Sequence, residues 1–442
     1  MKINTTKLND FFQSPIEISG KTYFLNNVLE NETLEVSINK EKRTIKIDKI
    51  INASKYRIKP KCDIYETCGG CKLLHVEYNH QLYLKTEMVK RLFKENNIKA
   101  TVLDTLGMDN PTEYRNKNQV VFGYNNQRKV VSGFYEENTH KIVNFTTCYL
   151  QDKVSDKIVN TIKDLMMKMR IMPYDEDKQK GLIRHVMVKR SKLLNETMVI
   201  IVTSSDVFPG RNNFLKALLA SNKEITTVIQ NINSRKTTQV LGDKEIVLFG
   251  KGYINDCLCD KKFKISSKSF YQINPIQTKV LYQKALDNAH LSKTDVLLDA
   301  YSGVGTIGII ASDKVSKVIS VELEKQAVND AIINAKLNNI KNIHFYNDDA
   351  TRFINNLVNK KEKIDVVVMD PPRKGSTESF LKAVLKLKPK KIIYISCDPH
   401  TQVVDLKSLV NDYNITYVQP VDMFPHTQHV ENIVVLNHKH YI

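Results

Sequence analysis

The C-terminal part of the sequence, residues 266–442, alternates short apolar runs with longer stretches that have a helical pattern. The runs lie at 296–299, 318–322, 343–346, 364–370 and 391–397. Runs that do not alternate between apolar and polar residues are typical of parallel strands, which the connecting helices bury on both faces. The sequence therefore predicts an α/β domain with a Rossmann-like sheet. Ligands of such sheets bind at the carboxyl ends of the strands.

A glycine-rich loop follows the first of these runs. Its sequence is Asp299-Ala-Tyr-Ser-Gly303-Val-Gly305-Thr-Ile-Gly308, and Glu322 ends the next run. Glycines let a backbone turn tightly and approach a ligand closely, while a carboxylate one strand further on can accept hydrogen bonds from both hydroxyls of a ribose. The pattern fits a nicotinamide dehydrogenase, an enzyme that uses S-adenosylmethionine, or a plain strand-to-helix turn. By itself it does not choose among them.

Two loops after later strands favour the adenosylmethionine enzyme. The fourth run ends in Asp370-Pro-Pro-Arg373, and the fifth ends in Ser-Cys397-Asp-Pro. A dehydrogenase has no use for a cysteine at this place, whereas methylation of the poorly nucleophilic C5 of a pyrimidine begins when a thiolate adds to C6. A buried structural cysteine is the ordinary alternative. The position of Cys397 beside the Asp370 loop favours a nucleophile.

Glu431 is the candidate for the base that such a reaction needs. After C5 has accepted a methyl group, its hydrogen must be removed before the thiolate can leave. Glu431 lies in His426-Thr-Gln-His429-Val-Glu431, at the start of an apolar run. The alternatives are a carboxylate that faces water and a metal site of His426, His429 and Glu431. Because a thiolate route needs no metal, we expect a general base.

Four of the seven cysteines form a pattern in front of this domain. Cys62, Cys68 and Cys71 are close in the sequence, and Cys148 follows later. So few cysteines in 442 residues do not make a disulfide framework. Four thiolates suit a tetrahedral zinc ion and an iron-sulfur cubane equally well, and His75 can replace Cys148 in a zinc site. The residues alone therefore predict a soft-metal site without naming the metal.

The length and patterning of the chain predict two further domains. With roughly 150 residues in an ordinary domain, a chain of 442 residues suggests about three. Segments 33–38 and 43–50 alternate with period two, so we expect a small β domain over 1–58. Residues 59–265 mix helical and strand patterns and predict an α+β domain. Its clearest helical face carries Leu84, Met88 and Leu92.

The formal net charge of the chain is +18, from 66 Lys and Arg against 48 Asp and Glu. This excess favours a polyanionic partner, although a lysine-rich genome gives the same number, and charge does not separate RNA from DNA or an anionic membrane. The run Tyr114-Arg115-Asn116-Lys117 mixes an aromatic ring with cations, as RNA contacts and solvated turns both do. No run of about 18 apolar residues occurs, so we expect a cytoplasmic protein without a membrane partner.

Together, these motifs resemble the RNA uracil-5-methyltransferase family, which makes 5-methyluridine in ribosomal and transfer RNA. The resemblance covers residues 1–440 and rests on the glycine loop, the Asp370 loop, Ser-Cys397-Asp-Pro and the His-x-Glu431 ending. It implies a class I methyltransferase domain at 266–442, with Cys397 as the nucleophile and Glu431 as the base. It also implies contacts to S-adenosylmethionine from Gln272, Tyr301, Thr306, Glu322, Asp349 and Asp370.

The resemblance extends to the two front domains. Residues 1–58 are similar to a degenerate copy of the RNA-binding β-barrel called TRAM, without its glycine-rich opening. Cys62, Cys68, Cys71 and Cys148 are similar to the ligands of the [4Fe-4S] cluster in the ribosomal-RNA branch of the family. The implied substrate is therefore 23S ribosomal RNA, ahead of the T-loop uridine of transfer RNA, and we expect a monomer. A non-catalytic RNA-binding metal protein would leave the Cys397 and Asp370 loops unexplained.

Overall fold

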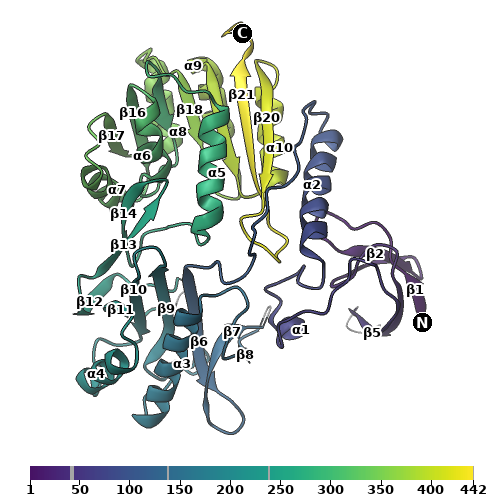
Figure 1. Ribbon diagram of the computed structural model, residues 1–442, viewed down its shortest axis with the longest axis vertical. Helices are drawn as coiled ribbons and strands as arrows, with labels where there is room; N and C mark the ends of the chain where they lie inside the picture. Colours follow the sequence, from purple (N-terminus) through teal and green to yellow (C-terminus); the bar gives the residue numbers. More distant parts are fainter. Residues whose placement is uncertain (40–43, 137–138, 237–238, 442) are drawn as a thin grey trace.

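The computed structural model describes residues 1–39, 44–136, 139–236 and 239–441. In Figure 1 the C-terminal domain lies at the top, the central domain at the lower left and the N-terminal β domain at the lower right. Helix α2 (Tyr78–Glu95) runs beside the C-terminal domain. Within these ranges, none of the helices combines the length and the apolar character that crossing a bilayer demands.

The C-terminal domain is built on a seven-stranded sheet with the order β17-β16-β15-β18-β19-β21-β20. Five strands are parallel, as the apolar runs predict: β15 Val296–Asp299, β16 Lys317–Glu322, β17 Ile343–Asn347, β18 Val366–Met369 and β19 Lys391–Ser396. The last two, β20 (Tyr413–Val421) and β21 (Glu431–His438), form an antiparallel pair, and β21 is antiparallel to β19. The sheet is therefore mixed rather than all-parallel. The loop 422–430 reverses the chain and brings the start of β21 to the carboxyl edge of the parallel strands.

Helices cover both faces of this sheet, so neighbouring residues of one strand belong to different cores. Leu297 of β15 packs in one apolar cluster and Leu298 in another. Full burial of such a side chain contributes about 1.5–3 kcal/mol, which explains why the central strands β15, β18 and β19 are rich in apolar residues on both faces. The helices are α5 Pro275–Asn288, α6 Thr306–Ala311, α7 Lys325–Leu337, α8 Ala350–Asn359, α9 Glu378–Leu387 and α10 Pro399–Leu409.

The central domain contains a second seven-stranded sheet with the order β12-β11-β10-β9-β6-β7-β8. Its strands are β6 Lys117–Tyr124, β7 Val130–Tyr135, β8 Ile142–Asn144, β9 Ile183–Ser191, β10 Glu196–Thr203, β11 Ile225–Ile232 and β12 Lys244–Phe249. Helices α3 (Lys153–Lys168) and α4 (Arg211–Ser221) pack against it. The Asp152 carboxylate begins α3 by accepting hydrogen bonds from the amides of Val154 and Ser155. The hairpin β13–β14 (Tyr253–Leu258 and Lys261–Ser266) leads into the C-terminal domain.

The N-terminal domain consists of two small sheets in the part of the chain that the structure describes. One sheet has three strands, β1 (Lys2–Asn4), β4 (Thr33–Asn39) and β5 (Thr44–Asn52), and the other is the hairpin of β2 (Ser14–Ile18) and β3 (Lys21–Leu25). The strands expected at 33–38 and 43–50 are thus present, apart from Arg43, which lies outside the described residues. The described pairings do not join the two sheets into one closed barrel.

Candidate functional site

The carboxyl edge of the C-terminal sheet gathers side chains that the sequence singled out. Asp299 ends β15, Asp370 directly follows β18 and Cys397 directly follows β19. Glu431 begins β21, and Asn432 beside it pairs with the last residue of β19. Because β21 runs against β19, its first residue lies at the edge where the parallel strands end. Four strands and the loops that follow them therefore bring a thiol and three carboxyl groups to one edge of the sheet.

Cys397 has anionic neighbours. Burial, together with the negative charges of Glu431 and Asp370, raises the pKa of the Cys397 thiol to about 12, against the lowering effect of the Arg373 guanidinium. The thiol is therefore protonated near neutral pH in the free protein, and a thiolate is the nucleophilic form of cysteine. Any change that adds positive charge or removes negative charge at this edge makes the thiolate more accessible.

Glu431 and Asp370 share this buried space. Burial raises the pKa of both carboxyl groups, and the Asp370 charge raises that of Glu431 further. Two carboxyl groups so placed resist simultaneous ionisation, so the pair retains a proton at a pH where isolated carboxyl groups have lost theirs. A carboxylate with a raised pKa is a stronger base than an ordinary one, which suits Glu431 to proton removal.

Tyr282 is a member of the site that the sequence did not indicate. It lies on α5, which covers one face of the sheet, and is buried. Burial raises its pKa well above the ordinary value, and the charges of Asp370, Glu431 and Asp299 act in the same direction. Its hydroxyl also makes a hydrogen bond with the side chain of Gln272. Tyr282 thus connects Gln272 to the carboxyl groups at the edge of the sheet.

Arg373 is the cation that faces these acidic groups. Its side chain is exposed, and its positive charge lowers the pKa of both Cys397 and Glu431. His429 lies nearby, and burial together with the Arg373 charge lowers the pKa of its imidazole to about 4. His429 is therefore neutral near pH 7 and adds no second positive charge. Arg373 stands where the sequence placed it, on the loop beside Cys397.

The glycine loop has the geometry that a nucleotide-sized ligand requires. Gly303 (φ 56°) and Gly305 (φ 80°) adopt left-handed backbone conformations, and an added Cβ at Gly303 would meet open space rather than protein. The Gly303 amide donates to the Glu322 carboxylate at 2.9 Å. At Gly308 an added Cβ would lie 2.7 Å from the Ser320 hydroxyl oxygen, so only glycine fits. The residues therefore leave room beside the loop and place a carboxylate next to it, as the ribose end of adenosylmethionine needs.

The remaining predicted cofactor contacts lie around this loop or at the same edge of the sheet. The Tyr301 hydroxyl donates to the Ser376 hydroxyl at 3.4 Å. Thr306 is the first residue of α6. Asp349 is the N-cap of α8. Its carboxylate accepts a hydrogen bond from the Arg352 amide at 2.9 Å, which leaves lone pairs on the carboxylate for a ligand.

The loop that precedes Glu431 is fixed to α2 by buried polar contacts. The Lys85 ammonium and the Asp422 carboxylate lie 2.6 Å apart, and both side chains are fully buried. The Tyr78 hydroxyl donates to the second oxygen of Asp422 at 2.9 Å. His426 exchanges two hydrogen bonds with the side chain of Gln81, one from its amide and one at Nδ1. The sequence contains one indication of this network. Lys85 is three residues before Met88 and seven before Leu92, so it lies beside the predicted apolar face of the helix, where a lysine needs a buried partner.

These contacts test the alternative of a metal site formed by His426, His429 and Glu431. His426 is engaged with α2, and its imidazole is buried, with a pKa lowered to about 4. Among the residues that the structure describes, no three His, Cys, Asp or Glu side chains are placed to hold a single metal ion. The arrangement at the end of β19 is one of a thiol, carboxyl groups and a guanidinium.

The four predicted metal-binding cysteines are brought together from segments that are far apart in the sequence. The charges of Cys148, Cys68 and Cys62 all act on Cys71 and, after burial, raise the pKa of its thiol to about 12. Burial likewise raises the pKa of Cys148 to about 11. Metal ligation requires the thiolate form, so a cation bound among these cysteines would offset the raised pKa values of Cys71 and Cys148. The donor types suit a soft metal centre, but among the described residues no group of three or more His, Cys, Asp or Glu side chains is placed to hold a metal ion.

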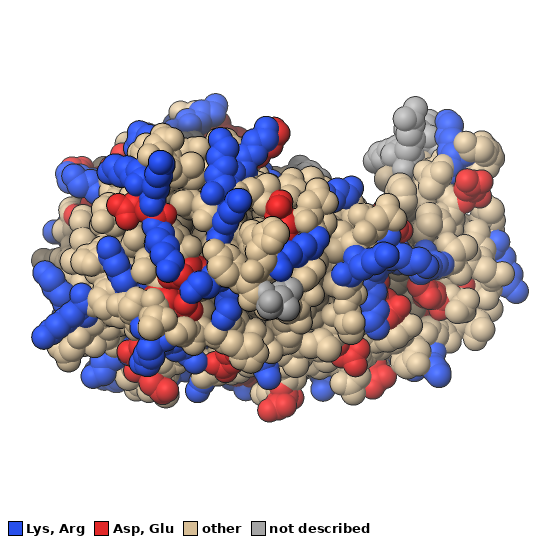
Figure 2. All heavy atoms as spheres, turned by 90° about the horizontal axis from the view of Figure 1, so that it is seen from above, with Lys and Arg blue, Asp and Glu red and all other residues tan. Residues whose placement is uncertain are grey.

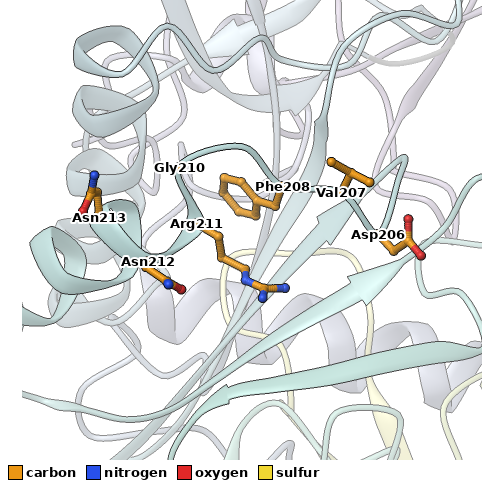
Figure 3. A pocket seen from close by; sticks show the side chains of 7 residues that line it. All are labelled: Asp206, Val207, Phe208, Gly210, Arg211, Asn212 and Asn213. Carbon is orange, nitrogen blue, oxygen red and sulfur yellow. The ribbon is translucent and has the colours of Figure 1, made fainter.

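An open hollow of about 530 Å³ lies on the central domain, away from these residues. Figure 3 shows Phe208 and Arg211 in its middle, with Asp206 and Asn213 towards its two ends. The Arg211 guanidinium donates to the side chain of Gln230 at 3.4 Å. The hollow contains no cysteine and no pair of acidic groups for acid–base chemistry. It does not compete with the edge of the C-terminal sheet as a catalytic site.

Comparison with known proteins gives concordant matches. The family described as tRNA (Uracil-5-)-methyltransferase matches residues 77–439. An uncharacterized RNA methyltransferase of Clostridium tetani is 40% identical over 427 residues, which covers 96% of this chain and 93% of the relative. One from Staphylococcus aureus is 39% identical over 429 residues, with coverages of 96% and 95%. The crystal structure of Pyrococcus abyssi tRNA (uracil-54, C5)-methyltransferase with S-adenosyl-L-homocysteine is 26% identical and superposes with a TM-score of 0.79, covering 99% of this chain and all of that one.

Proposed function

The chain belongs to the tRNA (uracil-5-)-methyltransferase family and has a class I methyltransferase fold, and from this premise we propose that it methylates C5 of a uridine in 23S ribosomal RNA through a covalent bond between Cys397 and C6. The observation that carries the proposal is the convergence of Cys397, Asp370 and Glu431 at the carboxyl edge of the sheet, beside the glycine loop. A dehydrogenase has no role for this thiol. An RNA-binding protein without catalysis has no role for the buried acid pair.

The chemistry follows from what each side chain offers. One uridine leaves its stack and enters the site, at a cost of a few kcal/mol. The Cys397 thiol first releases its proton to solvent. The thiolate then adds to C6, and the electron pair of the C5–C6 double bond moves towards C5 and the O4 carbonyl. C5 takes the methyl group that bound S-adenosylmethionine supplies, and S-adenosylhomocysteine remains as the second product. Glu431 then removes the C5 proton, the double bond re-forms, and the C6–sulfur bond breaks to return the thiolate.

We assign the methyl donor to the glycine loop and its neighbours. Glu322 holds the ribose hydroxyls, and Gln272, Tyr301, Thr306, Asp349 and Asp370 complete the contacts. The open space at Gly303 and the free lone pairs of the Glu322 carboxylate support this assignment. The Asp370 charge lies close enough to raise the pKa of Glu431, so it also serves the pocket of the target base.

The choice of 23S ribosomal RNA rests on the four cysteines. We propose that Cys62, Cys68, Cys71 and Cys148 bind a [4Fe-4S] cluster, because the other three cysteines lie near enough to Cys71 for their charges to raise its pKa, and four thiolates are the usual ligands of such a cluster. The cluster then organises the surface beside the central domain, and residues 1–58 form a TRAM-like RNA-binding domain next to it. In this division the central domain spans 59–265 and the methyltransferase domain spans 266–442.

A second candidate substrate is the T-loop uridine of transfer RNA. The observation in its favour is the superposition on the Pyrococcus abyssi enzyme, which acts on uracil 54 of transfer RNA. Purified protein should be given S-adenosylmethionine and unmodified transcripts of 23S ribosomal RNA and of transfer RNAs, and 5-methyluridine located by mass spectrometry. We expect methylation of the ribosomal transcript. Methylation of transfer RNA alone would replace the first substrate by the second, and methylation of neither would end the proposal.

The covalent step has its own test. RNA that carries 5-fluorouridine cannot release the C5 substituent as a proton, so the protein–RNA adduct should accumulate and survive denaturing electrophoresis. Cys397→Ala should abolish the adduct and all methyl transfer. Cys257→Ala is the matched control, because Cys257 is also a half-buried cysteine but lies on the β13 hairpin. An adduct in Cys397→Ala would assign the nucleophile to another residue.

The metal centre is tested by its composition. Protein purified without oxygen should contain about four irons and four sulfides per chain. Cys71→Ser should lose both, while Cys259→Ser should keep them. One zinc ion in place of iron would overturn the cluster and remove the argument that separates ribosomal from transfer RNA.

A further inference from the structure

Surface charge does not by itself trace a path for RNA on this protein. Figure 2 shows one face of the molecule, on which Lys and Arg side chains are spread widely with Asp and Glu between them. Cations that are exposed and interspersed with acids are well hydrated and need no ligand. A buried cation without a partner is more informative, because burial makes its charge costly unless an anion arrives.

Two lysines face each other in the central sheet, and one of them lacks a partner among the described residues. Lys117 on β6 is directly opposite Lys189 on the antiparallel strand β9. Directly opposite residues of antiparallel strands project from the same face, and like charges in this position destabilise a sheet. Met187, two residues before Lys189, packs with Ile254 and Ile265, which identifies the face as the one beneath the β13–β14 hairpin.

The two lysines differ in what surrounds them. The Lys189 ammonium donates to the carbonyl oxygens of Ser266 and Ser269 at 3.0 and 2.9 Å, while burial and the Lys117 charge lower its pKa to about 7. Lys117 is half-buried, and in the described ranges no acceptor lies within hydrogen-bond distance of its ammonium group. Burial lowers its pKa, and the neighbouring Arg115 charge lowers it further. Lys117 thus carries an uncompensated charge.

A small cavity opens at this pair. Its volume is about 30 Å³, and its lining includes Lys117, Lys189, Ser269 and Tyr271. A water molecule occupies about 10–15 Å³ on this scale, so the cavity accepts one or two small oxygen atoms but no base. The cavity is linked to the catalytic edge of the C-terminal sheet by hydrogen bonds. The side-chain amide of Asn116, which also lines the cavity, donates to the carbonyl oxygen of Gln272 at 3.0 Å. The Gln272 side chain in turn forms a hydrogen bond with Tyr282 at the catalytic edge.

We propose that Lys117, with Lys189 behind it, binds the non-bridging oxygens of a backbone phosphate of the RNA next to the flipped uridine. The assignment rests on the proposed function, which supplies a polyanionic substrate at this edge. A phosphodiester supplies the negative charge that would pair with the Lys117 ammonium group, and its oxygen atoms are small enough for the cavity. The phosphate contact positions the RNA strand beside the pocket for the target uridine, and other residues recognise the base itself.

The decisive variant is Lys117→Met, because it should weaken RNA binding without lowering stability. It removes an unpaired, half-buried charge from the free protein, so the thermal unfolding midpoint should stay unchanged or rise. It also removes a phosphate contact, so the Kd for a 23S ribosomal RNA transcript should increase about tenfold. The slope of log affinity against log salt, measured between about 50 and 200 mM, should become shallower by about 0.7.

Lys216→Met on α4 is the matched control, since it removes the same charge from an exposed position of the central domain. It should leave the salt slope and the unfolding midpoint unchanged. Lys117→Arg should keep most of the affinity. An unchanged slope in Lys117→Met, or a lowered midpoint, would overturn the phosphate site and make Lys117 a structural residue.

The two proposals fail separately. If the wild-type protein methylates neither ribosomal nor transfer RNA, the proposed function is lost. If it methylates one of them and Lys117→Met binds that transcript with the wild-type salt slope, the proposed function stands and the phosphate site is lost.

Discussion

Replacing Lys85 by methionine should destabilise the protein far more than the removal of an ordinary surface lysine. The substitution leaves the Asp422 carboxylate fully buried opposite an apolar side chain, with the Tyr78 hydroxyl as its remaining described side-chain partner. Removal of one member of a buried ion pair costs about 3–5 kcal/mol, because the other charge stays desolvated. Asp422→Leu should cost a similar amount by stranding the Lys85 ammonium.

The double variant separates this effect from a simple loss of packing. With Lys85→Met and Asp422→Leu together, no buried charge is left unpaired, and the main remaining loss is that of the acceptor for Tyr78, which costs about 1–3 kcal/mol. The double variant should therefore be more stable than either single variant. Additive costs of two independent sites would instead reach about 6–10 kcal/mol, twice the cost of one broken pair.

Urea unfolding followed by far-ultraviolet circular dichroism is the suitable assay, because the chain has no tryptophan for fluorescence. Lys90→Met serves as the control, since Lys90 lies on the same helix and pairs with Glu87 at the surface. It should produce no resolvable change. The reasoning is refuted if Lys85→Met unfolds at the same urea concentration as Lys90→Met, or if the two single costs simply add.

Three further predictions concern the catalytic edge. Iodoacetamide reacts with the thiolate form of a cysteine and not with the thiol. Because the pKa of Cys397 is raised to about 12, its alkylation in the free enzyme should accelerate as the pH rises towards that value. Asp370→Asn removes a negative neighbour and should accelerate alkylation of Cys397 at pH 8, while Arg373→Gln removes a positive one and should slow it, each by at most about tenfold. Peptide mass spectrometry identifies the alkylated cysteine. Equal rates in the two variants and the wild type would contradict the electrostatic account. Glu431→Gln should lower kcat about 10²–10⁴-fold and accumulate a methylated protein–RNA adduct on denaturing gels, whereas a variant that turns over normally would exclude Glu431 as the base. Glu322→Ala should raise the calorimetric Kd for S-adenosylmethionine about tenfold or more while leaving RNA affinity unchanged, and an unaltered Kd would place the ribose elsewhere.

The sequence alone indicated the parallel strands of the C-terminal domain and the residues at their ends. Strands that helices cover on both faces are rich in apolar residues, so β15, β18 and β19 can be recognised as apolar runs, and the residue that ends or follows each run lies at one edge of the sheet. β17 at the margin of the sheet is more exposed, and its run is correspondingly less apolar. Asp299, Asp370 and Cys397 could therefore be grouped without coordinates. The family resemblance stated from the same motifs is confirmed by the match over residues 77–439 and by the relatives.

The tertiary structure alone decided which distant residues share a buried environment. A lysine on a helix looks alike in sequence whether it is solvated or paired, and only the packing of α2 against loop 422–430 makes Lys85 and Asp422 an ion pair. The same loop reverses the chain, so that β21 joins the C-terminal sheet antiparallel to β19 and β20. Tyr282 and the opposed pair Lys117 and Lys189 are likewise products of packing and register. Local patterns encode how a segment is buried, but the identity of its neighbours is a property of the assembled fold.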